Sequence, residues 1–76
     1  MKKEIEIFSV KEKLPNNYES VVMIGNGIVR NGQFINGLFE TDDTELYGVI
    51  NESDKVDGAD VFVVKKWFSS SSIENI

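Results

Sequence analysis

The chain has 76 residues, 41% of them hydrophobic, and its 13 acidic and 8 basic side chains give a net charge of −5. This length allows one domain with a single small core, and the acidic balance argues against binding to a phosphate backbone. Because the chain has no Cys and no His, disulfides, Cys/His zinc sites, Cys nucleophiles and His general bases are all excluded. Because of its net negative charge, the chain is not expected to have nucleic acid as a partner.

The N-terminal stretch, MKKEIEIF, alternates charged and apolar residues and so lacks the continuous apolar segment of a secretory signal. No other run approaches the roughly 18 apolar residues that a membrane helix needs. The absence of Cys fits a reducing compartment. We expect a cytoplasmic protein that does not contact membranes.

The first elements expected are a short strand and a helical turn. Residues 4–8 alternate with a period of two, which predicts a strand with Ile5 and Ile7 on one face. Residues 9–14 begin with a Ser that can cap a helix and have a Glu three residues later, which predicts one helical turn. Pro15 ends that turn because it disfavours helical backbone at the preceding residue.

The central feature is an antiparallel meander over residues 20–39, in which apolar runs alternate with Asn-Gly pairs. Asn-Gly accepts the positive φ angles of a two-residue type I′ hairpin turn, so turns are expected at 26–27 and 36–37. The pair at 31–32 falls inside a strand, where Gly indicates a bulge or a close approach of another backbone. The fully apolar run 21–24 predicts a central strand.

The second half of the chain continues the β pattern. Phe34 and Phe39 are expected on adjacent strands. Trp67 follows an apolar strand and is expected to be a buried anchor. Further strands are predicted over 45–50 and 59–64, separated by a surface loop over 51–58 that is rich in turn residues.

These elements predict a mainly β fold: a small antiparallel meander sheet or partly open barrel of about five to six strands, with one short helical turn near the N-terminus. The domain is expected to cover residues 1–68, and the Ser-rich stretch 69–76 to form a flexible tail. The strands over 21–24 and 61–64 are apolar on both faces, so both faces of each strand must be covered by other parts of the structure. A closed barrel or a homo-oligomer, most simply a dimer, would supply it.

Two motifs that could hold a cofactor fail their physical requirements. The segment 25–27 (GNG) would need a third Gly at position 30 and a following helix to bind a dinucleotide, but that position is Arg30. A calcium loop with Gly58 at its sixth position would place Lys55 at its third and Val64 at its twelfth, where oxygen ligands are needed. We expect no cofactor and no metal.

Catalysis is also not expected. Asp42 and Asp43 are adjacent acids in a polar stretch, whereas general acid–base chemistry needs one carboxyl group to be desolvated. A domain this small without His or Cys has few ways to build a sheltered site. We therefore predict that the protein is not an enzyme and has no catalytic residues.

Residues 40–60 instead suggest a binding surface, because they hold eight acidic side chains against one basic side chain, Lys55. Arg30, the only Arg, is either a contact for an anion or carboxylate or an exposed charge that discourages pairing at a strand edge. The alternative for the acidic loops is plain solvation. The candidate partner-binding residues are Arg30, Glu40, Asp42, Asp43, Glu45, Asp54 and Asp57.

Four short segments carry a family resemblance: 10–15 (VKEKLP), 21–23 (VVM), 32–34 (GQF) followed by Phe39, and 64–67 (VKKW). They resemble the pattern of a small phage and prophage family, catalogued as domain of unknown function 551. The chain departs from it where members begin with Trp, here Ile7, and after the closing Trp, where Phe68 and a Ser run stand. The resemblance implies a phage or mobile-element origin and a compact β fold, with no catalytic residues to carry over.

Taken together, these features predict a small, acidic, phage-type protein that acts by protein–protein contact in the host cytoplasm and inhibits a host protein, such as a defence component. One alternative is an oligomeric binder that holds a small molecule or nucleotide between subunits. Another is a structural accessory protein with no active site.

Overall fold

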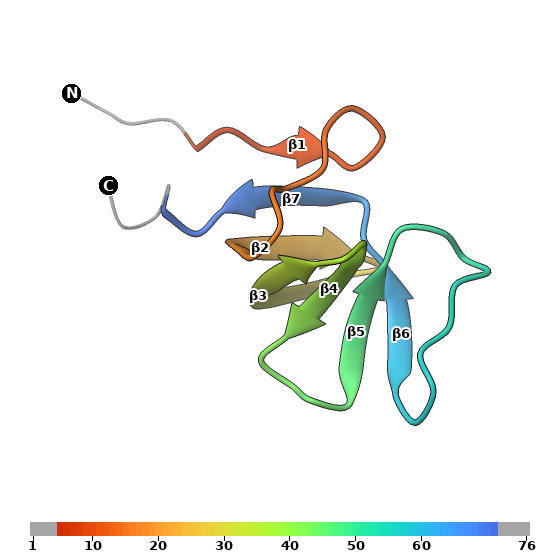
Figure 1. Cartoon of the computed structure of the whole chain (residues 1–76). Helices are drawn as coiled ribbons and strands as arrows, with labels where there is room; N and C mark the ends of the chain where they lie inside the picture. Colours follow the sequence, from red (N-terminus) through yellow and green to blue (C-terminus); the bar gives the residue numbers. More distant parts are fainter. Residues whose placement is uncertain (1–4, 72–76) are drawn as a thin grey trace.

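The computed structural model describes residues 5–71 and is mainly β, as predicted (Figure 1). In this part of the chain seven strands form one sheet in the order β1-β7-β2-β3-β4-β5-β6. The strands are β1 (Phe8–Ser9), β2 (Glu19–Gly25), β3 (Ile28–Ile35), β4 (Leu38–Thr41), β5 (Leu46–Val49), β6 (Asp60–Val63) and β7 (Lys66–Ser69).

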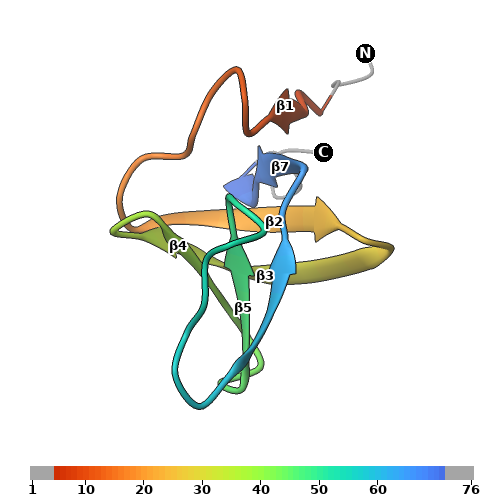
Figure 2. The ribbon, with the colours of Figure 1, turned by 90° about the vertical axis from the view of Figure 1, so that its right-hand side faces the viewer.

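The sheet is strongly curled but open. Its edge strand β6 is joined to β7, near the opposite edge, by only Val64 and Lys65. The Val64 amide donates to the Val49 carbonyl at 2.9 Å, whereas the Lys65 amide donates to the Ile24 carbonyl at 2.8 Å. These two bonds change the partner of the chain from β5 to β2, so the two ends of the sheet approach each other around one core (Figure 2).

The two hairpins at the centre of the sheet form as predicted. Asn26 and Gly27 have φ angles of 52° and 73°, and Asn36 and Gly37 have 49° and 84°. Positive φ at both central positions is the geometry of a type I′ turn, whose twist matches that of the flanking strands. The second turn sets Phe34 directly opposite Phe39, and the two rings pack edge to face with centroids 4.9 Å apart.

Gly32 lies inside β3, where it faces Val21 on one side and Thr41 on the other. The register runs through it without interruption, so there is no bulge. A Cβ atom at this position would collide with the Glu40 carbonyl oxygen and lie 2.9 Å from the Thr41 Cα. Of the two explanations that the sequence left open, close approach of another backbone is therefore the right one.

The pairing of β5 with β6 is the one departure from the predicted antiparallel arrangement in the described sheet. These strands run parallel, with Leu46 beside Asp60 and Val49 beside Val63. Parallel neighbours need a connection that returns along the length of a strand, and residues 50–59 provide it (Figure 2). Turn-forming residues predict that the chain bends in this segment, but they do not determine which direction it takes afterwards. The seventh strand, β7, was also not predicted as a separate element.

The N-terminal segment differs from its prediction in two ways. The strand expected over 4–8 is reduced to β1, and Ile7 is 52% exposed. The helical turn expected over 9–14 is not seen; instead the chain makes a tight turn in which the Glu12 and Lys13 amides both donate to the Ser9 carbonyl at 3.0 Å. Continuation into a helix is prevented because Ser9 pairs with Lys66 in the sheet and Pro15 follows shortly.

Trp67 is the buried anchor that the sequence predicts. Its side chain is 1% exposed, its ring lies 4.9 Å from that of Phe8, and its indole N–H donates to the Lys13 carbonyl at 2.9 Å. The Lys13 ammonium group in turn lies 4.6 Å from the centre of the Phe8 ring. The core cluster around Trp67 comprises Val21, Met23, Phe34, Phe39, Phe62 and Val64.

The Ser-rich stretch begins inside the sheet. Ser69 pairs with Val21 as the last residue of β7, and the Ser70 amide donates to the Ser20 carbonyl at 2.9 Å. The ordered pairing thus extends past residue 68, where the domain was expected to end. The rest of the expected tail, residues 72–76, lies outside the described residues.

Candidate functional site

Five acidic residues gather where β4 ends and β5 and β6 begin, at the bottom of Figure 1. Two loops meet there, 42–45 and 57–60, because the Asp60 amide donates to the Glu45 carbonyl at 2.8 Å. We call this region the acidic end and define it by five residues: Asp42, Asp43, Glu45, Asp57 and Asp60.

Loop 42–45 is held by Thr41. The Thr41 hydroxyl lies 2.8 Å from the Asp43 carbonyl and 2.7 Å from the Leu46 carbonyl, and it accepts the Asp43 amide at 3.0 Å. The Leu46 amide also donates to the Asp43 carbonyl at 3.0 Å. The backbone that carries these acids is thus fixed by its own hydrogen bonds, so the carboxylates are presented from a defined loop.

The carboxylates of this half of the chain fall into two groups. Asp43 accepts the Glu45 amide at 2.9 Å, and Asp54 accepts the Asn51 amide at 3.3 Å, so both stabilise turns. By contrast, the exposed carboxylates of six residues accept no hydrogen bond from any residue within 5–71: Glu40, Asp42, Glu45, Glu52, Asp57 and Asp60. Four of these, Asp42, Glu45, Asp57 and Asp60, lie at the acidic end and remain available to a partner.

The structure brings together only some of the candidate residues. Asp42, Asp43, Glu45 and Asp57 lie at the acidic end, whereas Asp54 lies in the connection between β5 and β6. Glu40 is exposed within β4, beside Gln33 and Tyr47 on the neighbouring strands.

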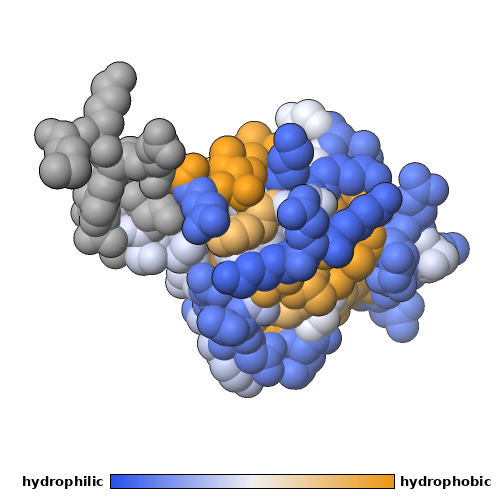
Figure 3. All heavy atoms as spheres, turned by 90° about the horizontal axis from the view of Figure 1, so that it is seen from above, coloured by the Kyte–Doolittle hydropathy of each residue, from blue (hydrophilic) through white to orange (hydrophobic). Residues whose placement is uncertain are grey.

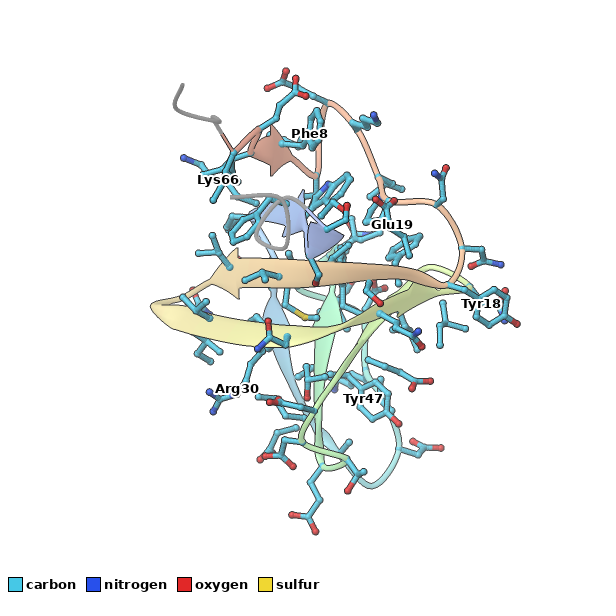
Figure 4. All side chains as sticks on the ribbon, turned by 90° about the vertical axis from the view of Figure 1, so that its left-hand side faces the viewer. Phe8, Tyr18, Glu19, Arg30, Tyr47 and Lys66 are labelled. Carbon is cyan, nitrogen blue, oxygen red and sulfur yellow. The ribbon has the colours of Figure 1, made fainter. Side chains whose placement is uncertain are left out.

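Arg30 lies on β3 opposite Met23, beyond the last residue of β4 that pairs with this strand. It is exposed (Figure 4), and within residues 5–71 its guanidinium group donates a hydrogen bond only to the Val29 carbonyl, at 3.5 Å. Asp60 was missed as a site residue because the predicted strand over 59–64 included it. Its negative charge near the start of an otherwise apolar strand was the available signal.

Charge is divided unevenly between two parts of the described chain. Residues 38–63 hold eight acidic side chains and one basic side chain, a net charge of −7. The remaining described residues, 5–37 and 64–71, hold three acidic and five basic side chains, a net charge of +2. The view from above in Figure 3, toward β1 and β7, shows apolar surface interrupted by hydrophilic side chains.

Two shallow hollows border the acidic end. The larger has a volume of about 410 Å³ and is lined by Glu45, Gly58, Ala59 and Asp60. The smaller has a volume of about 190 Å³ and is lined by Asn31, Gly32, Gln33, Glu40, Thr41 and Asp42. Both hollows are therefore formed partly by acidic side chains.

No group of three or more Asp and Glu side chains in residues 5–71 is arranged so that it could hold a metal ion. Across the same residues there is no helix of the length and apolar character that crossing a membrane requires. Comparisons with protein-family models, curated proteins and solved structures found no match. The resemblance to the phage and prophage family therefore stays a prediction.

Proposed function

We propose that this chain is a small protein-binding module that uses its acidic end to contact a basic surface on a partner protein. The observation that carries this proposal is the group of exposed carboxylates that accept no hydrogen bond within the described residues, presented from loops that are themselves fixed. Fixed loops lower the entropy that is lost on binding.

Electrostatics supports the same function. A net charge of −7 over residues 38–63 attracts a basic partner over a distance and raises the association rate. The same charges repel one another in the unbound protein, which disfavours folding to some extent. Five of these eight acidic side chains lie at the acidic end, and their concentration there is understandable if they serve recognition. On the strength of the phage-type resemblance, we propose a host protein as the partner and its inhibition as the result.

The proposal can be tested by affinity capture from a bacterial lysate with three immobilised proteins. The first is the wild type. The second, the acidic-end triple variant, combines Asp42→Asn, Glu45→Gln and Asp60→Asn. The third, the control triple variant, combines Glu6→Gln, Glu12→Gln and Glu19→Gln and removes the same number of charges elsewhere. The Glu19→Gln substitution keeps a side-chain oxygen that can accept the Asn16 amide, as the Glu19 carboxylate does at 2.9 Å.

We expect the wild type and the control triple variant to retain one stoichiometric protein at low salt and release it at high salt, because screening weakens contacts between exposed charges. The acidic-end triple variant should retain about tenfold less. Equal retention by both triple variants would contradict the proposal, and so would the release of a nucleotide or metabolite in place of a protein.

A further inference from the structure

One edge of the sheet carries backbone groups that the fold leaves unpaired. β6 is the last strand in the sheet order and, among residues 5–71, pairs only with β5. The Asp60 amide donates to the Glu45 carbonyl and the Val64 amide to the Val49 carbonyl, so residues 60, 62 and 64 face β5. Because successive residues of a strand face opposite edges, the backbone groups of Val61 and Val63 point away from β5.

The end of this outer edge, at Val63 and beyond, is covered by β2. Its beginning, at Val61, is open. The Lys65 amide, which points to the same side, donates to the Ile24 carbonyl, and the Val63 carbonyl oxygen lies against Gly25. In the described chain no backbone hydrogen bond reaches the amide or carbonyl group of Val61. Figure 2 shows no strand beside the outer edge of the lower half of β6. An unpaired edge of this kind can accept an added strand.

The open part of the edge begins at the larger hollow. Asp60 and Glu45 both line that hollow, and Asp60 immediately precedes Val61. A Lys or Arg side chain on an added strand that pairs with Val61 could therefore reach the exposed carboxylates of Asp60 and Glu45. Arg30 projects from β3 in Figure 4. Its positive charge would repel a basic side chain of the partner that was placed close to it.

We infer that the edge of β6 at Val61 binds an extended, basic segment of the partner protein, whose backbone pairs with Val61 and whose basic side chain enters the hollow beside Glu45 and Asp60. This inference rests on the proposed function and deepens it, because it assigns the acidic end a partner of one shape and charge. Backbone pairing supplies affinity, and the acidic hollow supplies the preference for a basic residue.

The test uses amide hydrogen exchange measured by NMR, with a short, capped peptide alternating Lys and Val as the probe. In the free protein we expect the Val61 amide to exchange at least about tenfold faster than the Phe62 amide, which faces β5. Saturating peptide should slow exchange at Val61 about tenfold. A peptide alternating Glu and Val, and the Lys–Val peptide N-methylated at each Val, should have no such effect.

Three variants separate this inference from the proposed function. Val61→Pro removes an N–H that β5 does not use, a change that edge strands tolerate, and should weaken peptide binding about tenfold; Val61→Thr keeps the N–H and should bind as the wild type does. If Glu45→Gln/Asp60→Asn abolishes binding but Val61→Pro does not, the acidic end binds and the added strand is wrong. The inference would also be overturned if the Lys–Val peptide failed to protect the Val61 amide. Protection that depended on protein concentration without peptide would overturn it as well, because it would indicate a second copy at the edge.

Discussion

The two ends of this small sheet are built differently. Around Trp67, contacts come from residues far apart in the sequence: Phe8 stacks on the indole, and the Lys13 carbonyl accepts its N–H. At the acidic end, most of the hydrogen bonds connect residues a few positions apart, as between Thr41, Asp43 and Leu46.

This difference indicates a division of roles. Burial of large side chains accounts for most of the stability of a domain, and the most buried large residues surround Trp67. The acidic end buries no charged side chain, and its exposed carboxylates contribute little to stability. Substitutions at the first end should therefore change the free energy of unfolding, and substitutions at the second should change binding.

The largest effect is expected for Trp67→Ala. The variant loses a side chain that is 1% exposed and leaves a cavity beside Phe8, so the free energy of unfolding should fall by about 3–5 kcal/mol. Urea denaturation measures it. Trp67→Phe keeps much of the apolar volume but not the bond to the Lys13 carbonyl, and should lose less. Trp67 fluorescence typical of a water-exposed indole in the folded wild type would contradict this assignment.

Gly32→Val should lower the free energy of unfolding by about 1–3 kcal/mol, because its Cβ would collide with the Glu40 carbonyl. The matched control is Asn31→Val, one position earlier on the exposed face of the same strand, which should be neutral or slightly stabilising since Val favours strands. Thermal denaturation of the two variants gives the comparison. A Gly32→Val protein as stable as the control would refute the close approach of the two backbones.

A smaller effect is expected for Asn17→Ala, at a link between the loop before β2 and the turn after β3. The Asn17 side-chain oxygen accepts the Asn36 amide at 2.8 Å, and its nitrogen donates to the Asn36 side chain at 3.3 Å. Loss of these exposed bonds should cost about 1 kcal/mol in urea denaturation. Asn16→Ala, whose side chain is not used in this way, should cost less; equal costs would mean that the link contributes nothing.

The predicted homo-oligomer stays a prediction, but its basis has changed. It rested on the strands over 21–24 and 61–64 being apolar on both faces, but Val21 and Val22, on opposite faces of the first, are only 0% and 5% exposed within one chain. Ile7 and Val29 remain 52% and 57% exposed. Light scattering after size-exclusion chromatography at micromolar concentrations should show a mass above that of one chain. One chain mass at every concentration would contradict it.

The sequence predicted best what depends on neighbouring residues. The Asn26-Gly27 and Asn36-Gly37 turns follow from residues that accept positive φ, and burial of Trp67 follows from its place beside an apolar strand. The parallel pairing of β5 and β6 could not be predicted in this way, because it depends on where the chain is directed after residues 50–59. The site shows the same limit. The acids in 40–57 could be identified from the sequence, but the hydrogen bond from Asp60 to Glu45, which joins loops 42–45 and 57–60 at the acidic end, is seen only in the structure.

The most direct test of the division between the two ends is the free energy of unfolding of the acidic-end triple variant, measured in urea at low salt beside the wild type and the control triple variant. Removing the charges of Asp42, Glu45 and Asp60 breaks no hydrogen bond in residues 5–71 and relieves repulsion. We expect a value equal to that of the wild type or higher by up to about 0.5 kcal/mol. A value lower than both by more than about 1 kcal/mol would show that these carboxylates stabilise the fold, and would contradict their assignment to recognition.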